Sequence, residues 1–419
     1  MRVAAVLGFC LPQSIHRKIG TYFVNYSCMN GYIPRLLEEK LAASLQNRKV
    51  LFLLGARQVG KTTLVENLLQ NCQGALLNMD IEVDRARLRS AAKLAPAEAM
   101  QNLGAEDVLV IDEAQRIDEI GQVVKGWYDA KVETKIILLG SASDVLLKTA
   151  AAELTGRNEK LWLTPLLFQE VLAQQEWYSD NLAPAQLLAD FPQQLQSLLL
   201  ERLVFGSYPE ALQTNEPADY LTNLSSDYLL KDLFTGSLIR SPEDVRRLLL
   251  ELAQELGTTI SVAQLASRLS LARQTVTRYL ELLQNIFVIF ELPAYYTDSF
   301  AEINKSSKYY FWDTGVKNAL QREWTVSAQR SDMAALWENW VLAELLKKQR
   351  TAGSHHELFF WRSRNDSSVD LVEKDGSTIT PYDIRLDGHG YTPSRSFATA
   401  YDKVPHVLTP ETALELLLT

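Results

Sequence analysis

The sequence predicts an α/β protein whose first domain is built around a parallel sheet. The first observation is the glycine-rich stretch Gly55-Ala56-Arg57-Gln58-Val59-Gly60-Lys61-Thr62-Thr63. The apolar run 50–54 before it is typical of a buried strand, and the run 64–69 after it is typical of an amphipathic helix. The second observation is the aliphatic run 108–111, which ends in Asp112 and Glu113. Strand, glycine loop, helix and an acidic-ended strand together predict a P-loop NTPase sheet.

The residue types in the glycine-rich stretch suit an anion. Two glycines let successive backbone N–H groups point inward, and the N-terminus of the following helix adds partial positive charge. Lys61 is predicted to reach the outer phosphates, and the Thr62 hydroxyl to ligate Mg²⁺. We therefore predict that residues 55–63 bind a nucleotide. The alternative is a glycine-rich turn that binds nothing.

The two carboxylates after the aliphatic run have assigned roles in this prediction. The run suits a central strand buried on both faces, so Asp112 and Glu113 would lie at the carboxyl edge of the sheet, where ligands bind. Asp112 is predicted to hold Mg²⁺, mostly through water, and Glu113 to orient or deprotonate the attacking water. Lys61 and Glu113 are thus the predicted catalytic residues. Alternatively, both acids are solvated loop carboxylates.

Other runs complete the predicted first domain. A helix is expected over 34–41, with Pro34 in its first turn, and strands over 75–79, 135–143 and 161–163. Ser141 or Ser143, at the tip of one strand, would sense the γ-phosphate or simply end the strand. Arg157 would supply positive charge to the reaction or pair with a surface acid, the commoner fate of an arginine.

Composition excludes several classes of protein. A hydrophobic fraction of 47% and a charged fraction of 22% are those of an ordinary globular protein. The net charge of −9 argues against a surface covered in phosphate-binding lysines. Three scattered cysteines favour a reducing compartment, and no apolar run is long enough for a membrane span, so a cytoplasmic protein is expected. Residues 1–28 are predicted to be an N-terminal extension or to precede the true start.

The middle of the chain predicts a helical region followed by a winged helix. Residues 260–270 and 271–284 suggest two helices joined by a short turn, and a strand pair would then run through Tyr296. The second helix would expose residues suited to base edges or phosphates, namely Arg273, Gln274, Thr277 and Arg278. The alternative is that this module packs on the first domain or on a partner protein.

The last third resembles the restriction-endonuclease-like fold. A helix over 333–348 carries Glu338, and strands over 358–361, 369–372 and 380–385 carry Asp370 and the tripeptide Asp383-Ile384-Arg385. In active members two carboxylates bind Mg²⁺ and a lysine positions the water. Arg385 stands where lysine is usual and cannot lose its proton. We therefore expect a recognition module or a degenerate remnant of the fold rather than an active nuclease.

The whole chain after Met29 resembles a group of bacterial and archaeal ATPases of the AAA superfamily that carry a C-terminal domain of unknown function. The resemblance rests on Tyr32-Ile33-Pro34-Arg35, the stretches from Gly55, Leu109, Leu139 and Thr155, and Gly206-Ser207-Tyr208-Pro209-Glu210. The family commonly has proline at position 56 and Ala-Gly-Arg at 155–157. The resemblance implies ATP binding with Mg²⁺ and slow hydrolysis to ADP.

The predicted organisation is an extension (1–28), an AAA-type P-loop ATPase domain (29–215), a helical and winged-helix region (216–300) and a smaller restriction-endonuclease-like α/β domain (301–419). The expected function is a nucleotide-gated switch acting on the C-terminal domains. The alternative is an ATP-assisted DNA-binding protein or nuclease. The sequence leaves open whether DNA or a protein is the partner that the winged helix would bind. It also leaves open the oligomeric state.

Overall fold

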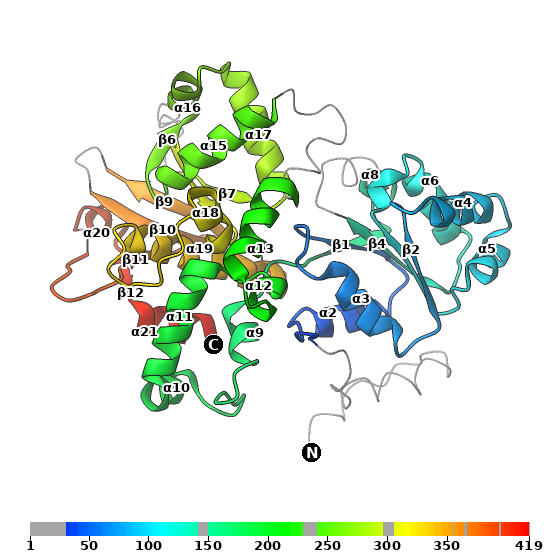
Figure 1. The fold of residues 1–419 in the computed structure, drawn as a ribbon, viewed down its shortest axis with the longest axis horizontal. Helices are drawn as coiled ribbons and strands as arrows, with labels where there is room; N and C mark the ends of the chain where they lie inside the picture. Colours follow the sequence, from blue (N-terminus) through cyan, green and yellow to red (C-terminus); the bar gives the residue numbers. More distant parts are fainter. Residues whose placement is uncertain are drawn as a thin grey trace.

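The computed structural model describes residues 31–140, 150–228, 241–295, 306–354, 356–363, 367–393 and 395–418. In Figure 1 these residues form two bodies, a blue and cyan sheet with its helices and a larger body coloured green to red. The predicted extension 1–28, the two serines Ser141 and Ser143, and Tyr296 lie outside the described residues. No helix among the described residues is long and apolar enough to cross a membrane.

The first body holds an all-parallel sheet in the order β2-β3-β4-β1-β5. Its strands are β1 (Val50–Leu54), β2 (Gly74–Asn78), β3 (Val108–Asp112), β4 (Lys135–Gly140) and β5 (Asn158–Trp162). Every residue of the three middle strands is buried, whereas most residues of the edge strands β2 and β5 are half-buried. Continuous aliphatic runs thus belong to strands covered on both faces, as predicted.

Helix α2 (Glu38–Ser44) precedes the sheet. The strands are connected by α3 (Lys61–Leu69), α4 (Glu82–Ala91), α5 (Pro96–Leu103), the 3₁₀ turn η1 (Ala114–Arg116), α6 (Ile120–Asp129) and α8 (Ala150–Glu153). The helix expected over 34–41 was placed too early, since α2 begins at Glu38. The Glu38 carboxylate accepts hydrogen bonds from Arg35 N (2.8 Å) and the Tyr32 hydroxyl (2.5 Å). Residues 32–35 therefore remain outside the helix, and Arg35 is free to point toward the sheet.

The second body begins with short helices: α9 (Phe168–Leu172), α10 (Pro184–Asp190), α11 (Pro192–Phe205), α12 (Pro209–Gln213), α13 (Pro217–Asn223), the π-helical turn η2 (Leu224–Tyr228) and α15 (Pro242–Gln254). Five of them start with proline, which suits the first helical position because its missing N–H is not needed there. α11 packs against α18 (Thr314–Gln321), and α10 against α21 (Pro410–Leu418). The helical region is therefore joined to the end of the chain.

A three-stranded antiparallel sheet follows, in the order β6-β8-β7. It consists of β6 (Thr259–Ser261), β7 (Ile289–Leu292) and β8 (Ser306–Phe311), with α16 (Val262–Leu269) and α17 (Arg273–Asn285) between the first two strands. Ser261 caps α16 through a reciprocal pair of hydrogen bonds with Gln264. The partner of β7 is β8, which lies beyond the predicted boundary at residue 300; the predicted domain ranges themselves remain predictions.

The last sheet is mixed and has the order β12-β11-β10-β9. Its strands are β9 (Glu357–Arg362), β10 (Ser368–Asp375), β11 (Thr378–Ile384) and β12 (His406–Leu408), of which only β11 and β12 pair in parallel. The long helix α19 (Met333–Ala352) precedes the sheet, and α20 (Arg395–Tyr401) lies before β12. Phe397 of α20 belongs to a small apolar cluster with Trp361, Val369 and Val372, while α19 joins the main core that begins in the first body.

Candidate functional site

The loop between β1 and α3 needs its two glycines for different reasons. A Cβ on Gly55 would lie 2.0 Å from the carbonyl oxygen of Leu163. Gly60 has φ +93°, in the left-handed region that glycine adopts without strain. Gln58 has φ 60° as well, and its side chain accepts a hydrogen bond from the Tyr220 hydroxyl of α13 at 2.9 Å. These turns allow α3 to begin at Lys61, directly after the loop.

Lys61 is buried, and its ammonium lies over the loop. Its Nζ donates to the carbonyl oxygens of Gly55 (3.0 Å) and Ala56 (2.8 Å). Gly55 and Ala56 thus contact the lysine, whereas the seven predicted residues 57–63 line a cavity. The positive charge predicted for this site is therefore held inside the loop.

Thr62 and Asp112 meet across the sheet edge. The Thr62 hydroxyl donates to Asp112 Oδ2 at 2.7 Å, and Glu113 N donates to Asp112 Oδ1 at 2.8 Å. No group of three or more His, Cys, Asp or Glu side chains in the described part of the chain has the arrangement of a metal site. Magnesium bound with a nucleotide needs only one or two protein oxygens, because waters and phosphates provide the others. One hydroxyl and one carboxylate, as found here, fit that requirement.

Glu113 follows β3 in a left-handed conformation, φ 51°, which is uncommon for a residue with a side chain. Its Oε2 accepts a hydrogen bond from Gln115 Nε2 at 2.5 Å. Such backbone conformations cluster at functional sites, where the surrounding structure compensates for the strain. Sequence reasoning selected Glu113 but missed Gln115, which orients it.

A cavity of about 570 Å³ joins these groups. The loop, Asp112 and Glu113 form one part of its wall, and two segments distant in sequence form the rest. Those segments contribute Gly31, Tyr32, Ile33 and Arg35 before α2, and Pro209, Glu210 and Gln213 of α12. The volume lies within the range of small-molecule and cofactor sites, about 300–1,000 Å³.

Helix α12 is held at this cavity from the C-terminal half of the chain. Buried Asp313, the N-cap of α18, accepts a hydrogen bond from Ser207 N at 2.6 Å. A Cβ on Gly206 would lie 1.9 Å from Asp313 Oδ1, so only glycine permits this approach. Burial raises the pKa of the Asp313 carboxyl. The Gly206-Ser207 turn thereby fixes where Pro209 and Glu210 begin α12.

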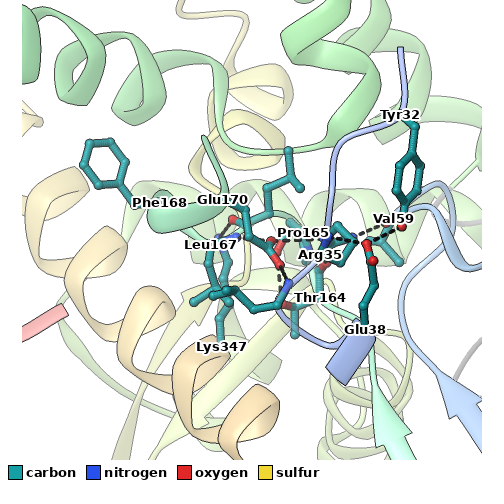
Figure 2. Close-up of polar contacts among 12 residues, drawn as sticks. Tyr32, Arg35, Glu38, Val59, Thr164, Pro165, Leu167, Phe168, Glu170 and Lys347 are labelled. Atoms are coloured by element: carbon teal, nitrogen blue, oxygen red, sulfur yellow. Dashed lines mark hydrogen bonds and ion pairs between the residues drawn. The ribbon is translucent and has the colours of Figure 1, made fainter. Parts of the chain in front are cut away.

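Arg35 is the main residue of this site to which sequence reasoning gave no role. Figure 2 shows its guanidinium between the loop and the segment 164–170. It donates to the carbonyls of Val59 (2.8 Å) and Thr164 (2.7 Å) and to Glu170 Oε2 (3.0 Å). Tyr32-Ile33-Pro34-Arg35 was among the residues that carried the family resemblance, which is the only sequence signal that pointed to it.

Arg157 takes the second of its two predicted roles. Its Nε forms an ion pair with Asp129 Oδ1 at 2.8 Å. Its carbonyl accepts a hydrogen bond from Val50 N, at the start of β1, whereas the glycine loop follows the end of β1. Arg157 therefore lies at the opposite edge of the parallel sheet from the cavity.

The C-terminal sheet also gathers acids, but cations accompany them. Lys308 Nζ of β8 is 2.8 Å from Glu338 Oε1 of α19 and 4.0 Å from Asp370 Oδ1 of β10. Arg385 Nη1 is 2.5 Å from Asp370 Oδ2. Asp383 is fully buried, and its Oδ2 accepts from the Tyr391 hydroxyl at 2.8 Å. The predicted acids come together as expected, whereas Lys308 was missed.

The four side chains predicted on the second helix of the middle region are all exposed. Arg273, Gln274, Thr277 and Arg278 lie on α17. Buried Val276, Tyr279 and Leu280 face the core from the other side of the same helix. This helix therefore presents two arginines to solvent.

Comparison with known proteins agrees with this geometry. A family model described as an AAA domain matches residues 47–172, and two models described as domains of unknown function match residues 196–327 and 333–414. An uncharacterized protein of Mycobacterium bovis and one of Mycobacterium tuberculosis are each 27% identical over 388 residues, which cover 90% of this chain and 78% of the relative.

A Walker-type ATPase of Pyrococcus abyssi has a similar fold, with a TM-score of 0.50 and 17% identity, covering 72% of this chain and 99% of that one. At this identity the likeness concerns the fold alone. The parallel sheet, its glycine loop and the family match on 47–172 agree with one another. Residues 47–172 are therefore an AAA domain with a P-loop NTPase fold, and the two segments after it match domains of unknown function.

Proposed function

We propose that this protein binds ATP, hydrolyses it slowly with Mg²⁺, and uses nucleotide occupancy as a switch for its C-terminal domains. The observation that carries the proposal is the cavity of about 570 Å³, which brings the glycine loop together with Lys61, Thr62, Asp112 and Glu113. These are the groups that position a nucleoside triphosphate and its attacking water in P-loop enzymes.

The chemistry follows from the placement of each group. Loop amides and the Lys61 ammonium would bind the phosphates by charge-assisted hydrogen bonds. Thr62 and Asp112 would hold Mg²⁺, which neutralises phosphate charge when bound. Glu113, oriented by Gln115, would accept the proton of the attacking water. Asp112 and Glu113 thus have separate roles because their carboxylates have separate partners.

Isothermal titration tests the binding half of this proposal. ATP, ADP and GTP are titrated into the wild type, Lys61→Ala, and the matched control Lys93→Ala, whose side chain is exposed and does not line the cavity. We expect the wild type to bind ATP and ADP and Lys61→Ala to lose about 10- to 100-fold in affinity for ATP, because a charge-assisted contact is removed. Equal affinity in the wild type and Lys61→Ala would contradict the assignment of the loop.

Contacts between the two bodies support the switch. Tyr220 of α13 donates to Gln58 of the loop. On the segment 164–170, which Arg35 contacts, Phe168 N donates to Glu344 of α19 at 2.8 Å, and Lys347 of α19 donates to Leu166 O at 3.1 Å. A loop that tightens around a triphosphate would act on both contacts. Switching requires that ATP and ADP interact differently with two arrangements of the chain.

Hydrogen exchange of the full chain tests the switch. We expect ATP, compared with ADP, to change protection in α13 and α19 as well as in the loop, and Tyr220→Phe to reduce the change in α13. A high basal turnover with identical exchange in ATP and ADP would contradict a switch.

We further propose that the elements from α15 to β8 form a winged helix. The support is the order of elements, α15-β6-α16-α17-β7-β8, and the antiparallel order β6-β8-β7. The exposed Arg273 and Arg278 favour duplex DNA as the second candidate partner. A salt-dependent shift of duplex DNA that disappears in Arg273→Glu/Arg278→Glu is the expected result, and salt-insensitive binding would contradict it.

The nuclease alternative has weaker support from the same geometry. Lys308 and Arg385 contact the acids that would otherwise be available to a divalent cation. Plasmid nicking with Mg²⁺ that is lost in Asp370→Ala would restore this alternative. We expect no nicking by the wild type.

A further inference from the structure

Arg35 is a buried cation that contacts the glycine loop directly. Its side chain is 5% exposed, and three of its nitrogens each donate to a different acceptor: Val59 O, Thr164 O and Glu170 Oε2 (Figure 2). Arg35 also lines the cavity, and a Cβ on Gly60 would be 4.0 Å from its Nη1. The guanidinium thus lies against one peptide unit of the loop, the one that joins Val59 to Gly60.

The hydrogen bond from Arg35 to Val59 O also determines the direction of the Gly60 N–H. The described residues contain no cis peptide bond, so the Val59 carbonyl and the Gly60 N–H point in opposite directions. Arg35 holds the carbonyl on its own side, which turns the Gly60 N–H toward the other side of the loop. No described residue accepts a hydrogen bond from this N–H. Because glycine permits many backbone orientations, the peptide needs an outside contact to fix one of them.

Arg35 can provide a fixed position because its partners are themselves held. Glu170 accepts hydrogen bonds from Leu36 N (2.7 Å) and Leu167 N (2.9 Å), and its side chain is 2% exposed. The planar guanidinium reaches three acceptors in fixed directions, which a lysine ammonium cannot do at one site. Arg35, held in place by Glu170, therefore sets the orientation of the peptide between Val59 and Gly60.

We propose that Arg35 is a positioning residue for the phosphate-binding loop: it aims the Gly60 N–H at the phosphates of the nucleotide. The inference rests on the proposed function, because it concerns the same cavity. It adds a residue from outside the glycine loop to the phosphate site, and it assigns that residue a role through the backbone rather than through direct catalysis.

The test is a titration series with ATP, ADP and AMP on the full chain. The variants are Arg35→Gln, Arg35→Lys and Glu170→Gln. Arg157→Gln is the matched control, because its Nε also contacts a carboxylate but at the far sheet edge. Binding stoichiometry and melting temperature are measured for each, so that loss of folded protein is separated from loss of affinity.

We expect Arg35→Gln and Arg35→Lys to weaken ATP binding by about 10- to 100-fold at unchanged stoichiometry, because an amide that contacts an anion is misdirected. AMP affinity should change by less than about threefold, since a preorganised loop amide matters most for the outer phosphates. Glu170→Gln should lower the melting temperature, but its loss of ATP affinity should be smaller than that of Arg35→Gln. Arg157→Gln should bind like the wild type.

Three results would overturn the inference. Wild-type ATP affinity in Arg35→Lys would mean that only the charge matters. Equal losses for ATP and AMP, or losses that follow the melting temperature across all variants including Glu170→Gln, would mean a purely structural role. A folded wild type that binds no nucleotide would overturn the proposed function itself. The titration of the wild type shows this without any of the variants.

Discussion

Asp112 of β3 and Asp370 of β10 are both buried, yet their carboxylates have different surroundings. Asp112 accepts hydrogen bonds from a hydroxyl and a backbone N–H, both neutral, and forms no ion pair with any described residue. Asp370 accepts from Arg385 and Ile384 N, and Lys308 lies 4.0 Å away. A buried carboxylate with neutral partners retains its attraction for a cation, whereas one with charged partners does not.

The same comparison extends to the neighbouring acids. Glu113 contacts an amide side chain and lines an open cavity, while Glu338 accepts from Lys308 (2.8 Å) and from the Tyr310 hydroxyl (2.5 Å). The two groups of acids thus have different surroundings within one chain. The first arrangement suits a ligand, and the second joins β8, α19 and β10 into one unit.

Replacing Glu113 with glutamine tests the ligand side of the comparison and should have the largest effect. We expect turnover to fall by about 10²- to 10⁴-fold, the usual contribution of a general base. Nucleotide affinity should stay within about threefold, since the side chain keeps its size. Phosphate release measures the first quantity and calorimetry the second. Glu119→Gln, exposed and outside the cavity, is the control; unchanged turnover in Glu113→Gln would assign the water to another residue.

Removing Lys308 tests the structural side. Lys308→Met should lower the free energy of unfolding by about 3 kcal/mol, because it leaves Glu338 and Asp370 without their shared cation in a nearly buried setting. The control Lys374→Met breaks an exposed pair with Glu357 and should change stability by no more than about 0.5 kcal/mol. Urea denaturation measures both. Equal effects would show that Lys308 does not compensate the two acids.

Magnesium should stabilise the protein through Asp112 and not through Asp370, with a smaller effect on stability than the loss of Lys308. With ATP present, replacing Mg²⁺ with EDTA should lower the stability of the wild type by about 1.4 kcal/mol for each tenfold loss of nucleotide affinity. Asp112→Asn should remove most of this difference, whereas Asp370→Asn should preserve it. Thermal unfolding of folded wild type and both variants gives the comparison. A magnesium effect that survives Asp112→Asn but not Asp370→Asn would reverse the assignment.

Asp383 offers the smallest test, through pH. Burial raises the pKa of its carboxyl above the ordinary 3.8, although the hydrogen bond from Tyr391 lowers this pKa in part. Its Oδ1 has no hydrogen-bond partner among the described residues. The folded state therefore holds this proton more tightly than the unfolded state. The stabilisation from this proton is fully present below the unfolded pKa and is lost as pH rises through the folded pKa.

Asp383→Asn lacks this titration, so the wild type should become less stable relative to the variant as pH rises from ~4 to ~7. Urea denaturation at several pH values measures the difference, with Asp387→Asn, an exposed acid, as the control. A difference that does not depend on pH would show that Asp383 is equally protonated in both states.

Much of this protein was predictable because the signals are local. A loop with glycines at fixed spacing, a lysine and a threonine can be recognised within nine residues, and a strand buried on both faces must be a continuous aliphatic run. Strands β1 to β4, α19 and the acids Asp112, Glu113, Glu338, Asp370 and Asp383 were found in this way. Strand ends were shifted by a few residues, most in β5, because edge strands are only half-buried and their pattern is weak.

Other features depend on which segments meet in three dimensions, and no short stretch of sequence contains that information. Arg35 contacts Glu170 from 135 residues away, and Lys308 contacts Glu338 from 30 residues away. The sequence alone determined that this chain has a glycine loop with the P-loop pattern and a buried strand that ends in two acids. Only the tertiary structure decided which cations neutralise which acids, because ion pairs and hydrogen bonds depend on distance in space and not on order along the chain.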